Sequence, residues 1–335
     1  MRRGNQTSVT EFVILGFPSL EKFSILLFVV FLTIYLFTLV GNTLIFLLVR
    51  TDRRLHKPMF LLLNNLSLLE ICYTSVIVPK MLSGFLPTSK NISFTGCMVQ
   101  LYTFSALGAA ECYLLTVMAY DRYLAICKPL HYATLMSSTS CLKLAAGSWI
   151  GGFISPVLPV VLISRLPFCG PNVINYFYCD AQPLLKLSCM DTFTTEASIS
   201  ILASTLIVSS FVLTVVSYIY IISTILRMSS ATGRQKAFST CGSHLTVVIV
   251  FYGTIVCMYV QPTGGYSLDV NKVLSLSYTV FTPMLNPIIY SLRNKDIKDA
   301  LRRVIRRSNV CPRKRSDCHM KSGWKRAKVK VISVH

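Results

Sequence analysis

Apolar residues are concentrated in seven separate stretches of the chain, each roughly 20 residues or longer. Charged, proline-rich or glycine-rich connections separate these stretches. A helix needs about 20 apolar residues to cross about 30 Å of hydrocarbon, and it satisfies its own backbone hydrogen bonds there. The pattern therefore predicts an all-α membrane protein, a seven-transmembrane helix bundle. The predicted spans are residues 24–49, 58–79, 97–121, 141–163, 197–226, 237–260 and 271–292.

A short amphipathic helix is predicted after the last span. Four apolar residues recur at helical spacing among the basic residues of 293–307: Ile297, Leu301, Val304 and Ile305. This pattern is typical of a helix that lies on an anionic inner membrane surface. Residues 308–335 are basic and lack periodicity, which predicts a disordered tail attracted to membrane lipids.

Composition agrees with a membrane protein. Of the 335 residues, 53% are hydrophobic and only 14% are charged, which is too apolar for a soluble domain of this size. The net charge of +20 alone could indicate a nucleic-acid partner, but 15 of the 33 lysines and arginines follow Ser291. The charge belongs to the tail, and no nucleic-acid partner is predicted. The first apolar stretch starts late and is long enough to span, so we expect an anchor rather than a cleaved signal peptide.

The distribution of basic residues predicts the orientation. The connections on one side, together with the tail, carry 25 of the 33 lysines and arginines, and the other side carries 8. The richer side is expected to be cytoplasmic. The chain then divides into an extracellular N-terminus (1–23), a transmembrane domain (24–292), a membrane-surface helix (293–307) and a cytoplasmic tail (308–335). Asn5 begins a glycosylation sequon, which fits an extracellular segment.

Four cysteines fall on the predicted outer side. Cys97 opens the third span, while Cys169, Cys179 and Cys189 lie in the connection between the fourth and fifth spans. Disulfides persist on the oxidising side of a membrane, and four cysteines allow three pairings. A zinc site is the alternative, but that connection contains no histidine and the cysteine spacing is unusual for zinc.

Two carboxylates lie inside apolar spans, Glu70 in the second and Glu111 in the third. A carboxylate is costly there unless it is paired, protonated or hydrated. A monovalent cation such as sodium, or a shared proton, is one candidate partner, and oxygen ligands suit such a hard cation. The alternative is that one or both carboxyls stay neutral and hydrogen-bond to polar neighbours. Those neighbours are Asn42, Ser67, Asn286 and Ser291.

Two motifs carry a resemblance to a known family. Asp121-Arg122-Tyr123 ends the third span, and Asn286-Pro287-Ile288-Ile289-Tyr290 lies in the seventh. Together with seven spans they resemble the rhodopsin-like G protein-coupled receptors, and more specifically the olfactory receptors. Further matching motifs are Gly41-Asn42, Leu55-His56-Lys57-Pro58-Met59-Phe60, Leu66-Ser67-Leu68-Leu69-Glu70, Ser217-Tyr218, Lys236-Ala237-Phe238-Ser239-Thr240-Cys241-Gly242-Ser243-His244 and Pro283-Met284-Leu285.

The resemblance implies a disulfide pattern and an output switch. It implies bonds from Cys97 to Cys179 and from Cys169 to Cys189, with a lid of Phe177, Tyr178, Asp180 and Ala181 over a cavity. It also implies that Arg122 is held by Asp121 at rest and is freed when the sixth span moves outward and exposes a cleft for a G protein. The residues that the resemblance assigns to this switch are Asp121, Arg122, Tyr123, Tyr218, Asn286, Pro287 and Tyr290.

The sixth span departs from the wider receptor pattern. Its inner end reads Arg234-Gln235-Lys236 where many relatives carry an acidic partner for the arginine. Phe251-Tyr252-Gly253 stands where relatives carry a tryptophan and a kinking proline. Tyr252 is therefore expected to be the switch beneath the ligand, with an ordinary core aromatic as the alternative.

A ligand cavity is expected between the outer halves of the third, fifth, sixth and seventh spans. A count of five turns back from Arg122 gives its depth. The expected lining residues are Phe104, Ser105, Gly108, Ala109, Leu202, Leu206, Tyr252, Ile255, Tyr259, Leu276 and Thr279. Amine receptors of the wider family carry an aspartate at Phe104, so a cationic amine would find no counter-ion at that depth. Burial of apolar area is expected to dominate binding.

The resemblance implies an odorant receptor of the plasma membrane. It would bind a small volatile, largely uncharged molecule and activate a stimulatory, olfactory-type G protein that raises cyclic AMP. No phosphate loop or His-Glu motif is present, and no enzyme activity or cofactor other than sodium is expected. Alternatives are a receptor for a lipid or other metabolite and a sodium- or proton-coupled transporter that uses Glu70 and Glu111. Internal repeats would favour a transporter, and we see none.

Overall fold

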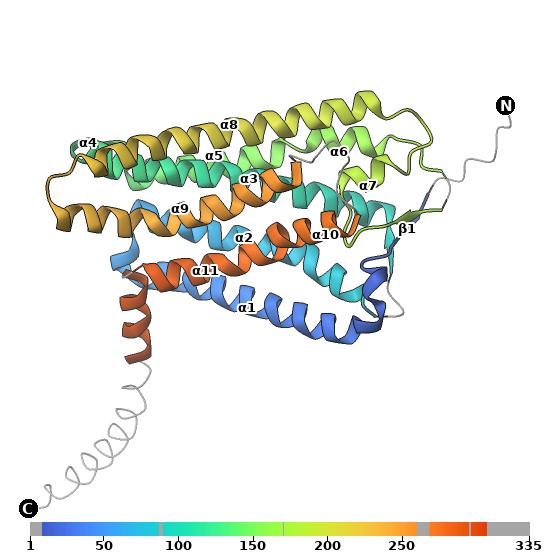
Figure 1. Ribbon diagram of the computed structural model, residues 1–335, viewed down its shortest axis with the longest axis horizontal. Helices are drawn as coiled ribbons and strands as arrows, with labels where there is room; N and C mark the ends of the chain where they lie inside the picture. The colour runs from blue at the N-terminus through green and yellow to red at the C-terminus, as the bar shows by residue number, and fades with distance from the viewer. Residues whose placement is uncertain (1–8, 87–89, 170, 260–267, 295, 307–335) are drawn as a thin grey trace, which may run out of the picture.

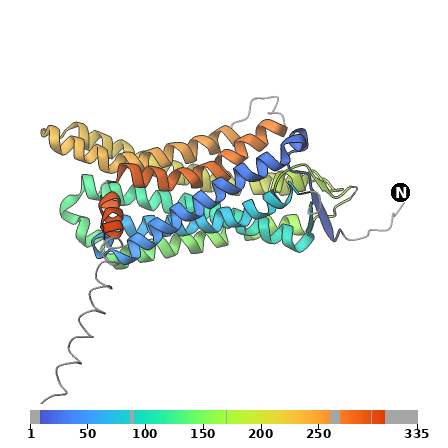
Figure 2. The same cartoon turned by 90° about the horizontal axis from the view of Figure 1, so that it is seen from below.

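Long helices that run side by side make up the molecule. The computed structural model describes residues 9–86, 90–169, 171–259, 268–294 and 296–306. The bundle runs through α1 (Ser24–Thr51), α2 (Pro58–Ser83), α3 (Phe94–Cys127), α5 (Ser138–Ile154) with α6 (Val157–Ser164), α8 (Phe193–Leu226) and α9 (Ala231–Tyr259). The last rod consists of α10 (Leu268–Leu276), the π-helical turn η3 (Ser277–Phe281) and α11 (Thr282–Arg293). Figures 1 and 2 show these elements as one elongated bundle.

Length and polarity identify the membrane-spanning part. In the described part of the chain, five helices are long and apolar enough to cross a membrane. They are Pro18–Thr51, Pro58–Ser83, Phe94–Cys127, Ser138–Ser164 and Phe193–Leu226, and a shorter apolar stretch, Cys241–Val256, lies in α9. Large apolar side chains on the outer helices are exposed, as at Ile25 (83%) and Ile201 (66%). Such exposure is expected where the surrounding solvent is lipid.

α3 is the central helix, because it packs against α2, α5, α8 and α9. Close approach between helices depends on small residues at two points. A Cβ at Gly152 on α5 would lie 2.5 Å from the Cβ of Ala110 on α3. A Cβ at Gly41 on α1 would lie 2.9 Å from Pro287 on α11. Small residues at such contacts are typical of membrane helices.

A small sheet at the outer end was not expected from the sequence. The strand β1 (Glu11–Ile14) pairs antiparallel with β2 (Asn91–Ser93) and parallel with β3 (Val173–Ile174). The first described residues are thereby joined to two outer connections. The Lys272 ammonium on α10 donates to the carbonyl of Gly16 and to the Asn175 amide oxygen, both at 2.8 Å.

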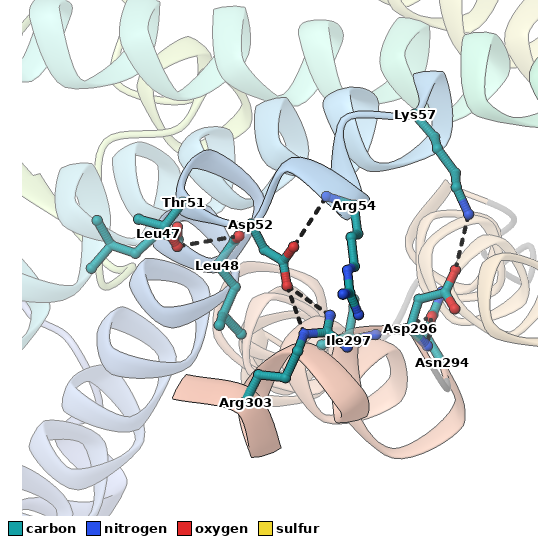
Figure 3. Close-up of polar contacts among 10 residues, drawn as sticks. All are labelled: Leu47, Leu48, Thr51, Asp52, Arg54, Lys57, Asn294, Asp296, Ile297 and Arg303. Atoms are coloured by element: carbon teal, nitrogen blue, oxygen red, sulfur yellow. Dashed lines mark hydrogen bonds and ion pairs between the residues drawn. The ribbon is translucent and has the colours of Figure 1, made fainter. Parts of the chain in front are cut away.

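At the opposite end, a helix over residues 296–306 turns away from the bundle axis (Figure 1). Two ion pairs attach it to the turn between α1 and α2, as Figure 3 shows. Arg303 donates to Asp52 from Nη2 at 2.6 Å and from Nε at 3.0 Å, and Lys57 lies 3.5 Å from Asp296. The hydrogen bond from Arg303 lowers the pKa of Asp52. Ile297 faces inward, as the amphipathic pattern predicted.

Candidate functional site

A cavity of about 220 Å³ lies in the outer half of the bundle, between α3, α6, α8 and α9 and below the long outer connection. Aliphatic and aromatic side chains form most of its wall. The lining residues are Tyr73, Leu101, Phe104, Ser105, Gly108, Ala109, Cys112, Ser155, Pro156, Pro159, Val160, Ile163, Asp180, Ala181, Ile199, Leu202, Ala203, Leu206, Ile207, Phe251, Ile255 and Tyr278. Such a surface suits a small, mostly apolar ligand.

Seven of the residues expected to bind ligand lie in this wall: Phe104, Ser105, Gly108, Ala109, Leu202, Leu206 and Ile255. Three others do not. Thr279 is fully buried and donates to the carbonyl of Ser275 at 2.7 Å, and Leu276 is buried at the start of the same π-helical turn. The side chain of Tyr259 lies outside the described residues. Tyr252 is the third of these residues: it follows Phe251, which lines the cavity, but does not line the cavity itself.

Tyr252 belongs to a polar layer beneath the cavity. Its hydroxyl donates to Ser210 Oγ at 3.0 Å, which joins α9 to α8. Thr116 on α3 hydrogen-bonds to the carbonyl of Ser210 at 3.3 Å and lies 3.4 Å from the hydroxyl of Thr214. The ring of Phe251, which lines the cavity, meets the Tyr252 ring edge-on at 5.2 Å. A ligand that contacts Phe251 therefore lies next to Tyr252, whose hydrogen bond joins α9 to α8.

The outer connection covers the cavity and is rigidly attached. The structure contains both disulfides that the resemblance implied, Cys97–Cys179 and Cys169–Cys189. The amide of Cys179 also donates to Gln100 Oε1 on α3 at 3.0 Å. Of the expected lid residues, Asp180 and Ala181 reach the cavity wall. Phe177 and Tyr178 are buried above it, and the Tyr178 ring lies 4.9 Å from that of Phe104.

Glu70 and Glu111 face one another in the middle of the bundle, and both are buried. Asn286 Nδ2 donates to Glu70 Oε1, so one of the expected neutral partners is present. Asn42 is engaged elsewhere, with the carbonyl of Thr38 at 3.0 Å. The two carboxyls lie within hydrogen-bonding reach of each other. Within the described residues, Glu70 Oε2, Glu111 Oε1 and Asn286 Oδ1 accept a hydrogen bond from no other group. The arrangement fits either a proton shared between the carboxyls or a hard monovalent cation.

The inner end of α3 carries a buried ion pair. Arg122 donates to Asp121 Oδ2 through Nε, at 2.9 Å, and through Nη2. The other carboxyl oxygen accepts a hydrogen bond from Tyr132 on α4 (Pro129–Leu135) at 2.8 Å. Asp121 therefore holds Arg122 on its own, since the inner end of the sixth span carries no acidic partner for the arginine. This is the resting arrangement that the resemblance implied for Arg122.

The other expected switch residues surround this pair. Tyr218 on α8 is hydrogen-bonded to His244 Nδ1 on α9 at 2.6 Å rather than to Arg122. Tyr290 is fully buried, and its hydroxyl has no partner within the described residues. The Tyr123 ring lies 5.9 Å from that of Tyr220. Pro287 is the residue that a side chain at Gly41 would meet.

The sequence did not identify the partners of two residues at this end, His244 and Tyr132. Neither could be found from helical spacing alone, because each makes its contact with another element. Asn5, the expected glycosylation site, lies outside the described residues.

Comparison with known proteins gives one family. Residues 31–308 match the olfactory receptor family. The chain is 53% identical to human olfactory receptor 6N1 over 310 residues, which cover 92% of this chain and 99% of that protein. It is 53% identical to human olfactory receptor 6Q1 over 302 residues, covering 90% and 95% of the two chains, and 50% identical to mouse olfactory receptor 8U9 over 309 residues, covering 92% and 98%. The chain belongs to the olfactory receptor family, whose members are multi-pass plasma-membrane receptors that couple to G proteins.

Proposed function

We propose that this receptor binds a small volatile, largely uncharged odorant in the outer cavity and activates a stimulatory, olfactory-type G protein that raises cyclic AMP. The observation that carries the proposal is the apolar cavity next to Phe251 and Tyr252, with the Asp121–Arg122 pair at the far end of the same helix α3. The cavity and the Asp121–Arg122 pair are two sites on one helix, and α9 touches both. The role of the receptor is to change conformation when a ligand binds, and it catalyses no reaction.

The orientation follows from the two ends of the bundle. Both disulfides lie at the end that carries the sheet and the cavity, which supports an extracellular location for that end. The Asp121–Arg122 end is then cytoplasmic. In the active state, α9 moves outward, the Tyr218–His244 bond breaks and Arg122 leaves Asp121 to meet the G protein. Membrane lipids surround the apolar outer faces, and the two-state helix movement is what makes the coupling allosteric.

A leucine at Gly108 should occupy the cavity and abolish the cyclic AMP response. Gly108 lines the cavity, and a Cβ added there would meet nothing closer than Tyr73 at 3.9 Å, so the larger side chain has room to enter. The matched control is Gly147→Leu on α5, where a Cβ meets nothing within 4 Å on an exposed face. A cyclic AMP reporter assay against an odorant panel, with surface delivery measured in parallel, tests this. A full response from Gly108→Leu would contradict ligand binding in this cavity.

We also propose that Glu70, Glu111 and Asn286 hold a sodium ion that favours the resting state. Their three buried oxygens, which accept from no other described group, support the proposal. When bound, the ion would neutralise carboxylate charge that the apolar interior tolerates poorly. A transporter would use the same carboxylates as a relay, and substrate uptake without cyclic AMP signalling would favour that alternative. A cyclic AMP response to a lipid or other metabolite, but to no odorant, would instead favour a receptor for that lipid or metabolite.

Glu111→Gln should remove the sodium dependence of basal signalling. The amide keeps the size of the carboxyl but loses the charge that holds the cation. Basal cyclic AMP is compared in sodium buffer and in choline buffer. Glu196→Gln, at the exposed outer start of α8, is the control and should keep the wild-type difference between buffers. An unchanged sodium effect in Glu111→Gln would rule out the site.

A further inference from the structure

Asp180 gives the cavity wall a charge. Of the described residues that line the cavity, it is the one that is ionisable at neutral pH, and no lysine, arginine or histidine is among them. Burial raises the pKa of Asp180 to about 6, so most molecules carry the carboxylate at pH 7. The cavity therefore has an anionic outer end.

One oxygen of this carboxylate is already used. Oδ1 accepts the amide of Ala181 at 2.8 Å and caps α7 (Ala181–Leu185). Oδ2 makes no hydrogen bond to a described residue. The neighbouring Cys179 is fixed by its disulfide to Cys97 and by the hydrogen bond to Gln100. The carboxylate is therefore held in place at the cavity with one acceptor oxygen to spare.

The other polar groups of the wall are neutral: the thiol of Cys112 and the hydroxyls of Tyr73, Ser105, Ser155 and Tyr278. The inner end is formed by Cys112, Leu206 and Phe251. The hydroxyl of Ser155, which also lines the cavity, already donates to the carbonyl of Gly151 at 2.7 Å. A hydrocarbon body fits the inner end, and a hydrogen-bond donor fits the Asp180 end. Bonds to a carboxylate are the stronger ones when water is excluded.

We propose that Asp180 is a specificity-determining residue that selects ligands with a hydroxyl or amine hydrogen-bond donor at one end of a hydrocarbon body. This inference rests on the proposed function, because it names the ligand class of the same cavity. Phe104 leaves the middle of the cavity without a counter-ion, and Asp180 supplies an anionic group nearer the outer mouth. A ligand carboxylate is rejected, because it would face Asp180 with no cation in the described wall to offset the repulsion.

The test uses four probes with the same hydrocarbon body: octanol, octylamine, octanal and octanoate. Potency is measured by cyclic AMP response and binding by the rise in unfolding midpoint of the purified receptor. The wild type should favour octanol and octylamine over octanal and should not respond to octanoate. In Asp180→Asn the cap of α7 is retained, because asparagine caps as well as aspartate. Its amide nitrogen then faces the cavity in place of Oδ2 and can only donate a hydrogen bond. Octylamine, which is protonated at pH 7 and also only donates, should weaken about tenfold or more, octanol should weaken less because its oxygen can accept, and octanal should not weaken.

The matched control is Asp191→Asn in the same outer connection. Asp191 is exposed, caps the amide of Phe193 at 2.9 Å and does not line the cavity, so all four potencies should stay at wild-type values. Donor-selective binding without a cyclic AMP response would support this inference and contradict the proposed function. Equal stabilisation of the wild type by all four probes, or by none, overturns the inference. An equal shift of every probe in Asp180→Asn overturns it as well.

Discussion

Replacement of Arg122 by alanine should abolish the odorant-induced cyclic AMP response while the receptor still reaches the cell surface. Arg122 is 6% exposed and its charge is directed at Asp121 rather than at solvent. In the proposed active state it is the group that leaves this pair to contact the G protein. Alanine removes that group without adding bulk to the inner end of α3. The response is measured with a cyclic AMP reporter and normalised to surface receptor.

Two further variants separate loss of output from loss of structure. Tyr132→Phe removes only the hydrogen bond to Asp121 at 2.8 Å, so it should loosen the resting pair and raise basal cyclic AMP. Arg122→Lys keeps the charge but cannot form the forked contact of a guanidinium, and an intermediate response is expected. An undiminished response of Arg122→Ala at normal surface density would show that output does not pass through this residue.

Replacement of Cys97 by serine should cause the largest loss of stability and of surface delivery. The Cys97–Cys179 bond joins residues 82 positions apart, and it also fixes the outer connection that covers the cavity. Loss of such a bond typically costs about 2–5 kcal/mol. The Cys169–Cys189 bond closes a loop of 20 positions, so chain entropy predicts a cost lower by about 1 kcal/mol. Unfolding midpoints of the purified variants test the order.

Cys72→Ser is the control for this pair of variants, since Cys72 is a free, half-buried cysteine on α2. It should retain wild-type delivery and unfolding midpoint to within a small change. A Cys97→Ser receptor as stable as Cys169→Ser would show that the longer tie contributes no additional stability. A Cys97→Ser receptor as stable as the wild type would show that hydrogen bonds such as Cys179 to Gln100 hold the lid alone.

Hydropathy predicted the helical spans well, but not where the helices end. The third span was expected over 97–121, while α3 runs from Phe94 to Cys127. The α8 and α9 helices also begin before their apolar stretches. Polar turns continue these helices beyond the hydrocarbon, and a hydropathy pattern does not register them. The sheet formed by β1 escaped prediction because each of its pairings joins segments far apart in the chain.

The depth of the cavity was predicted best along α3. Because the rise per residue is constant, a count of turns from Arg122 reaches Phe104 and Gly108, and both line the cavity. Thr279 does not line the cavity, because the π-helical turn Ser277–Phe281 adds a residue per turn and rotates its side chains. Disulfide pairing came from the resemblance, since spacing left three pairings open. The position of Asp180 in the wall depends on that pairing and on Gln100, so no local pattern could reveal it.

The ion pair of Asp52 with Arg303 connects two distant parts of the chain at the inner end. It fastens the helix over 296–306 to the turn after α1, and α1 packs against α2 and α11 rather than α9. The helix over 296–306 follows α11, which packs against both α1 and α9. The ion pair therefore joins two segments that are 251 positions apart in the chain. At the inner end the transmembrane domain is thus closed on itself, with the turn after its first helix fastened to the helix that follows its last.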